Sequence, residues 1–149
     1  MSLELVEAFI GAKAYNSASI SITNGAVQAL TLDTNEFNTN SIHSTLTNTS
    51  RFTAPITGYY LFAGSCSWGA ASASGRRQLF VKINGGSDSS WVQTLSFPIT
   101  PNTDLPIEQV CGIELLNAGD YIEFYVTQNS GTTLSAAQLN RFYMTYIGG

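Results

Sequence analysis

The sequence has 149 residues, a length that suits one domain with a sizeable core. Charged residues make up 11% and hydrophobic residues 44%, whereas average soluble chains carry roughly 25% charged residues. The net charge of -4 and the scatter of the six Lys and Arg residues exclude a nucleic-acid-binding surface, which needs clustered cations. Solubility must come from Ser, Thr and Asn, and the low charge suggests that part of the surface is buried against copies of the same chain.

Residues 1–10 form the one segment that looks detachable, and we predict an N-terminal extension or attachment segment there and a single domain over residues 11–149. No apolar run approaches the ~18 residues of a membrane span, so we expect no membrane insertion. Glu4 and Glu7 replace the basic start of a signal peptide. We therefore expect a chain that is cytosolic at synthesis, belongs to a longer exported protein, or is released by lysis.

Alternating apolar and polar side chains predict strands over residues 59–68, 76–83, 107–116, 121–128 and 139–147. Asn84-Gly85-Gly86 and Asn117-Ala118-Gly119-Asp120 carry hairpin chemistry between them. Pro98, Pro101 and Pro106 break residues 97–106 into a loop. Helical periodicity is nearly absent, so the pattern predicts an all-β, antiparallel sandwich or barrel.

Two kinds of strand are distinguishable by their faces. The predicted strands 76–83 and 121–128 have one polar face, whereas 59–68, 107–116 and 139–147 are apolar or small on both faces. A sheet that is apolar on both faces usually has both faces covered. One face can pack on the core, and a second copy of the chain is the expected cover for the other. The residues expected at this contact are Tyr59, Leu61, Tyr143 and Ile147.

Catalytic and metal-binding patterns are weak. The single histidine, His43, is expected to form structural hydrogen bonds, and the acidic residues are spread singly, so we predict no enzyme and no cofactor. Calcium is the one metal for which ligands exist, from Asp33, Glu36 and either Asn38 or Asp104. Cys66 and Cys111 are either two small buried hydrophobic residues or one cross-strand disulfide.

Several motifs resemble those of the C1q-like globular head, a jelly roll of the tumour necrosis factor superfamily. Residues 52–62, Phe-Thr-Ala-Pro-Ile-Thr-Gly-Tyr-Tyr-Leu-Phe, are similar to the family's F-x-A-P-x-x-G-x-Y-x-F signature. Asn84-Gly85 resembles the central hairpin, and residues 118–131 resemble the L-x-x-G-D-x-V…V-x-Q-x-S-G stretch. Residues 14–17 and 37–43 resemble a variant common in phage and bacterial proteins.

The resemblance covers residues 10–147, with departures at Gly64, where the family has an aromatic residue, and in the closing strand. It implies a two-sheet jelly roll of about ten strands and a homotrimer packed around a three-fold axis. No collagen-like Gly-X-Y stalk precedes the domain. The resemblance to phage proteins implies a virion component, such as a fibre tip, a tail-associated protein or a capsid decoration. The alternative is a bacterial secreted or cell-surface adhesion head, located extracellularly.

The ligand-binding end follows from strand direction. Because antiparallel strands alternate, the loops 69–75, 97–106 and 129–137 should lie at one end, opposite both chain termini. The termini attach a domain to its carrier, so the free end is the expected site for a host-surface glycan, a host protein or another virion protein. Candidate binding residues there are Arg76, Asn102, Asp104, Asn129, Thr132 and Thr133, with Pro98 and Pro101 beside them.

Overall fold

The computed structural model describes residues 9–69, 74–86, 92–96 and 106–149. Strands are the only regular secondary structure within these residues. No helix long and apolar enough to cross a membrane occurs in them. The strands are β1 (Gly11–Tyr15), β2 (Ile20–Ile22), β3 (Val27–Ala29), β4 (Thr34–Asn38), β5 (Arg51–Thr53), β6 (Gly58–Ser67), β7 (Arg77–Ile83), β8 (Gln93–Ser96), β9 (Ile107–Leu116), β10 (Tyr121–Gln128), β11 (Leu134–Ala136) and β12 (Arg141–Gly148).

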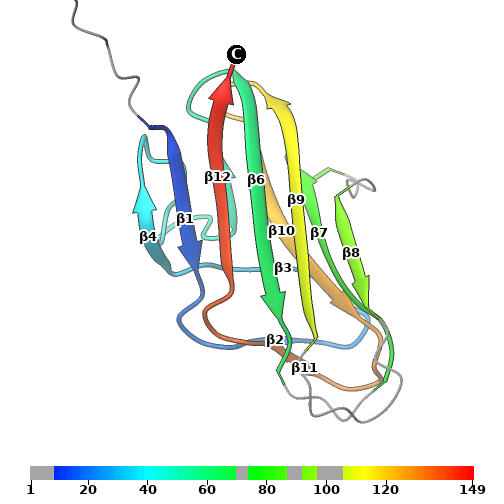
Figure 1. Cartoon of the computed structure of the whole chain (residues 1–149). Helices are drawn as coiled ribbons and strands as arrows, with labels where there is room; N and C mark the ends of the chain where they lie inside the picture. The colour runs from blue at the N-terminus through cyan, green and yellow to red at the C-terminus, as the bar shows by residue number, and fades with distance from the viewer. Residues whose placement is uncertain (1–8, 70–73, 87–91, 97–105) are drawn as a thin grey trace, which may run out of the picture.

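Two antiparallel sheets face each other, which confirms the predicted all-β sandwich (Figure 1). The front sheet has the order β4-β1-β12-β6-β9. The back sheet has the order β3-β10-β7-β8, and β5 pairs with β10 beside β3. A two-stranded ribbon of β2 and β11 completes the described part, which holds twelve strands against the ten or so expected. The surplus consists of short strands whose three residues are too few to show a periodicity.

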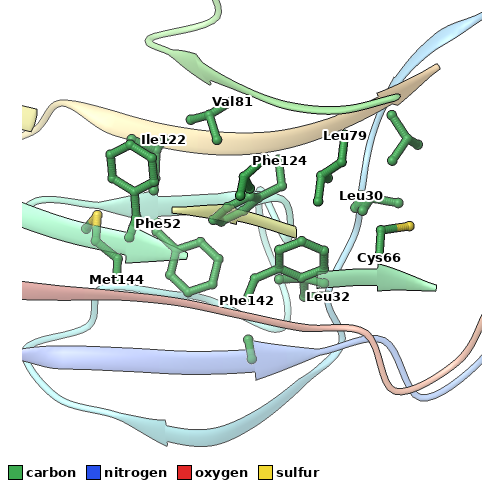
Figure 2. Close-up of a cluster of buried hydrophobic side chains, with 14 of the residues drawn as sticks. Leu30, Leu32, Phe52, Cys66, Leu79, Val81, Ile122, Phe124, Phe142 and Met144 are labelled. Carbon is green, nitrogen blue, oxygen red and sulfur yellow. The ribbon is translucent and has the colours of Figure 1, made fainter. Parts of the chain in front are cut away.

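The core fills the space between the sheets with aromatic and aliphatic side chains (Figure 2). The ring of Phe124, from the back sheet, lies 4.5 Å from that of Phe142 and 5.9 Å from that of Phe52, measured between centroids. Gly64 of β6 lies directly under Phe142, and a Cβ added to Gly64 would collide with the ring. The departure from the family motif at this position therefore has a packing reason, because an aromatic side chain at 142 occupies the space.

The strand limits were predicted well in the second half of the chain. β9 and β10 match the predicted ranges 107–116 and 121–128. The last strand begins at Arg141, because Leu139 adopts a left-handed backbone with φ of 64°. Asn140 is buried beside it, where its Oδ1 accepts a hydrogen bond from Ser67 N at 2.8 Å and its Nδ2 donates to Ala137 O at 2.8 Å. The chain thus turns sharply before β12.

The two predicted turns, at residues 84–86 and 117–120, both form. The second does not make a hairpin, because it links strands of different sheets. Asn84 and Gly85 have positive φ of 52° and 65°, and the strands β7 and β8 that flank this region pair with each other. Residues 117–120 close with a hydrogen bond from Asp120 N to Asn117 O. This second turn carries the chain from β9 of the front sheet to β10 of the back sheet, so the expectation of a hairpin there was wrong. Tight-turn chemistry alone does not specify whether the next strand joins the same sheet.

The cysteines are both free and lie on opposite faces of the front sheet. Cys66 is fully buried among core residues, as predicted. Cys111 is exposed, so the idea that both are buried was wrong. Cys111 pairs in register with Ala63, whereas Cys66 pairs with Glu108. A disulfide between the two cysteines is therefore excluded, since their side chains point away from each other.

The described turns and loops are distributed between the two ends of the sandwich as the alternating strand directions predicted. At the terminal end, where β12 finishes in Figure 1, Gly149 lies beside Gly58 and Ala118 N donates to Thr57 Oγ1 at 3.1 Å. The distal end holds the far termini of β6, β7 and β10, where Gly69 N donates to Ser135 O at 2.7 Å. At the start of the described chain, the ring of Phe9 lies 5.6 Å from that of Phe37 and Ile10 packs against the core. β1 begins at Gly11.

Candidate assembly face and distal loops

The face of the front sheet that points away from the core is apolar and exposed; we call it the assembly face. In β6, Tyr60 and Phe62 are buried, while Tyr59 is 50% exposed. In β12, Phe142 and Met144 are buried while Tyr143 and Ile147 are exposed. All four residues predicted for the contact between copies, Tyr59, Leu61, Tyr143 and Ile147, therefore lie on this face.

β9 extends the assembly face with residues that the sequence reasoning did not select. Ile107, Ile113 and Leu115 are each more than half exposed, at 61%, 55% and 57%. Ile113 pairs with Leu61 and Leu115 pairs with Tyr59, so the apolar side chains form rows across adjacent strands. The alternation of residues 107–116 indicated that alternate side chains share a face. Only the pairing of β9 with β6 shows which of the two sets faces outward.

Charged residues border the apolar rows on the side of the front sheet formed by β1 and β4. Lys13 Nζ lies 2.8 Å from Glu36 Oε2, and Arg141 Nε lies 2.5 Å from Glu36 Oε1. Hydrogen bonds from Lys13 and Arg141 lower the pKa of the Glu36 carboxyl. Glu36 was a candidate calcium ligand, but here two cations occupy its oxygens. This group gives the assembly face a polar rim with a defined arrangement of charge.

A shallow hollow of about 440 Å³ lies between the polar rim and the rows of β9. Its floor consists of the small residues Ala63, Gly64 and Ser65 of β6. Tyr143 and Arg141 border it on one side and Cys111 on the other. A flat apolar face with one such hollow can receive a side chain that projects from another surface.

The distal end brings two of the predicted binding residues together. Arg76 N donates to Asn129 Oδ1 at 2.6 Å, and Asn129 N donates to Arg76 O at 3.2 Å. The side chain of Asn129 thus ties the loop before β7 to the loop after β10. Its carbonyl oxygen is already used inside the protein, so a structural role for Asn129 is established alongside any binding role.

The other predicted binding residues divide into two groups. Thr132 and Thr133 are exposed in the loop before β11, and Thr132 O accepts a hydrogen bond from Gln128 Nε2 at 2.7 Å. Asn102, Asp104, Pro98 and Pro101 lie outside the described residues. A binding role for these loops stays a prediction.

A buried polar cluster underlies the distal end and was not predicted. Glu108 of β9 is fully buried and accepts hydrogen bonds from Trp68 Nε1 and Ser96 Oγ. Burial raises the pKa of the Glu108 carboxyl, while the nearby guanidinium of Arg77 opposes that shift. Arg77 is itself buried and donates to Gly75 O at 2.7 Å. The cluster joins the starts or ends of four strands, β6, β7, β8 and β9, beneath the distal loops.

His43 forms structural hydrogen bonds, as predicted. Its Nδ1 lies 2.6 Å from Asn35 Oδ1 and its Nε2 lies 3.0 Å from Thr49 O. The ring is buried against Phe52, and burial lowers its pKa. Both ring nitrogens are thereby engaged, which leaves neither of them available to activate a nucleophile.

The predicted calcium ligands Asp33 and Asn38 make hydrogen bonds within the protein, and calcium binding stays a prediction. Asp33 accepts hydrogen bonds from Ser17 N at 2.8 Å and Ser17 Oγ at 2.7 Å. The side chain of Asn38 binds the backbone of His43: Asn38 Nδ2 donates to His43 O at 2.6 Å, and His43 N donates to Asn38 Oδ1 at 3.1 Å. No group of three or more His, Cys, Asp or Glu residues that could hold a metal ion occurs in the part of the chain that the structure describes. Asp104 lies outside it.

Solved structures with the same fold are numerous, although no protein-family model and no curated protein matches the sequence. The Eiger TNF of S. frugiperda is 15% identical, with a TM-score of 0.66 over 94% of this chain and 93% of that one. The globular domain of zebrafish complement 1qA protein is 15% identical, with a TM-score of 0.63 over 93% of this chain and 97% of that one. Murine APRIL is 11% identical, with a TM-score of 0.65 over 93% of this chain and 99% of that one.

These likenesses span nearly the full length of both partners, and they confirm the predicted TNF/C1q-like jelly roll. At 11% to 15% identity they establish the fold, and function must be argued from the surfaces of this chain.

Proposed function

We propose that the chain is a non-enzymatic binding module that assembles as a homotrimer through the assembly face. The observation that carries this proposal is the row of half-exposed apolar residues across three adjacent strands, β12, β6 and β9. Exposed apolar patches of this kind mark interaction surfaces, because water solvates them poorly. The polar rim of Lys13, Glu36 and Arg141 fits the border of an interface, whose core is apolar and whose edge is charged.

Symmetry limits how copies of the chain could cover this face. The face of one copy would meet either the same face or a different surface of another copy. Ile107, Ile113 and Leu115 lie on β9, which is an edge strand, so the apolar area reaches the rim of the sandwich. The β9 edge of one copy can pack against the assembly face of the next copy, and three such contacts close a ring. The resemblance to C1q-like heads supports the same count of three.

The distal loops are the proposed ligand-binding end, and the proposed setting is a virion. They lie opposite the terminal end, which would join the domain to its carrier. The ligand would be a host-surface glycan or protein, or another virion protein. The alternative setting is a bacterial cell-surface or secreted adhesion protein. A non-enzymatic role is supported by His43, whose ring nitrogens are both hydrogen-bonded, and by burial of the Cys66 thiol, which raises its pKa.

Binding of labelled protein to bacterial cells and to a glycan array tests the role of the distal loops. The double variant Thr132→Ala/Thr133→Ala should bind more weakly than wild type, because it removes two exposed hydroxyls from the distal end. The control Ile56→Ala changes an exposed residue at the terminal end and should bind as wild type does. Equal binding by all three proteins would place the ligand site elsewhere.

A further inference from the structure

A second hollow, here called the flank pocket, lies where the loop 40–50 meets β5 and the start of β10. Its volume is about 350 Å³, which falls within the range of small-molecule pockets. The polar side chains that line it are Ser41, Ser44, Thr47, Asn48, Arg51, Thr53 and Tyr121. Hydroxyls, an amide and a guanidinium thus converge on one space, and none of the lining residues is acidic.

Several of these polar groups are not used inside the protein. The side chains of Ser41, Asn48 and Thr53 make no hydrogen bond to any residue that the structure describes. Ser41 and Asn48 also have left-handed backbones, with φ of 55° and 48°. Such conformations cost about 1 kcal/mol or more in non-glycine residues, and they concentrate at ligand sites. Ser41 and Asn48 are exposed, so their donors and acceptors meet water and are open to a ligand that replaces it.

Arg51 is held rigidly at the wall of the pocket. Its Nε lies 3.5 Å from Glu123 Oε1, and its Cζ lies 4.0 Å from the centre of the Tyr121 ring. Glu123 is buried and also accepts a hydrogen bond from Ser50 Oγ at 2.6 Å. The charge of Arg51 is thereby balanced, while its terminal Nη groups donate to no acceptor among the described residues and remain available as donors.

We propose that the flank pocket binds a neutral saccharide unit. The guanidinium offers several N–H donors, which hydroxyl oxygens of a sugar can accept. Asn48 supplies both a donor and an acceptor, and the hydroxyls of Ser41 and Thr53 supply either. An anionic ligand is disfavoured because Glu123 already neutralises Arg51, and an apolar ligand would strand the polar wall without partners.

The site is independent of the proposed trimer. The flank pocket belongs to the β5 side of the back sheet, whereas the apolar edge strand β9 contacts β8 at the opposite side. The assembly face lies on the other sheet. Assembly through the front sheet would therefore leave the pocket open in every copy, and three linked sites would add to avidity for a multivalent glycan.

Saturation-transfer NMR on the full chain tests the proposal with glucose, galactose, mannose, N-acetylglucosamine and glucuronate as probes. At least one neutral sugar should receive saturation. Asn48→Gly removes the amide while suiting the left-handed backbone, and Arg51→Lys keeps the charge beside Glu123 but removes the guanidinium. Each should weaken binding about fivefold or more, the loss expected for one hydrogen bond of about 1 kcal/mol.

The matched control is Asn40→Gly, which changes an exposed left-handed asparagine outside the pocket wall and should bind as wild type does. Circular dichroism checks that each variant is folded. Saturation of no sugar, saturation of glucuronate alone, or equal binding by the pocket variants and the control would overturn the proposal. None of these results bears on assembly, which is read from the solution mass.

Discussion

Placing a charge on the assembly face should dissociate the assembly without unfolding the chain. Tyr59 is 50% exposed in the single chain, and its cross-strand neighbours, Leu115 and Gly148, carry no positive charge. Tyr59→Asp therefore costs the isolated domain little, within about 0.5 kcal/mol as for other surface substitutions. In the assembled state the same carboxylate would be desolvated and unpaired.

The magnitude follows from the symmetry of the proposed trimer. An uncompensated buried charge costs at least ~3 kcal/mol, and three-fold symmetry repeats it in each copy, which gives ~9 kcal/mol for the assembly. Each ~1.4 kcal/mol is a tenfold change, so the association constant should fall about a millionfold. Tyr143→Asp should act more weakly, because Lys13 pairs in register with residue 143 and can partly balance the new charge.

The assay is light scattering on a sizing column, with urea unfolding measured in parallel. Tyr59→Asp should elute as a folded monomer. Thr133→Asp, which places the same charge in an exposed distal loop, should keep the wild-type mass. A Tyr59→Asp protein that retains the wild-type assembly would refute the assignment of this face, since a desolvated carboxylate has no partner there.

Two further predictions concern stability. In urea titrations, Gly64→Ala should lower the free energy of unfolding by about 1–3 kcal/mol, because the added Cβ would collide with the Phe142 ring. The control Ser65→Ala, on the opposite face of the strand, should change it by less than about 0.5 kcal/mol. Equal effects of the two substitutions would contradict the packing of this strand. Burial holds the pKa of His43 below its ordinary value of 6.5, so as the pH falls below that value the unfolded chain takes up a proton that the folded chain excludes, and stability declines. His43→Gln should remove this part of the decline between about pH 7 and about pH 5, and an unchanged slope would show that His43 does not cause it.

The second half of the fold was predictable because its signals are local. β9 and β10 combine strict alternation with tight turns, and both elements match the predicted limits. The two-faced apolar character of residues 59–68 and 139–147 placed Tyr59, Leu61, Tyr143 and Ile147 on one face. Period-two patterning fixes which side chains share a face, so these assignments needed no knowledge of the partner strand.

Features that depend on register across the sandwich could not be predicted. The rim of Lys13, Glu36 and Arg141 joins three strands that are distant in sequence, and their pairing alone brings the charges together. Glu108 is a carboxylate buried with Trp68 and Ser96, and only the folded arrangement brings these donors to it. The turn at residues 117–120 was recognised, but its chemistry does not say that it links two sheets.

The solution mass of the wild-type chain, measured by light scattering, tests the central claim most directly. A mass of three times the 16.0 kDa of one chain is predicted, because three copies can close a ring over the exposed rows of β6, β9 and β12. A monomer at concentrations where the protein is folded would contradict the account, since the apolar assembly face would then have no cover.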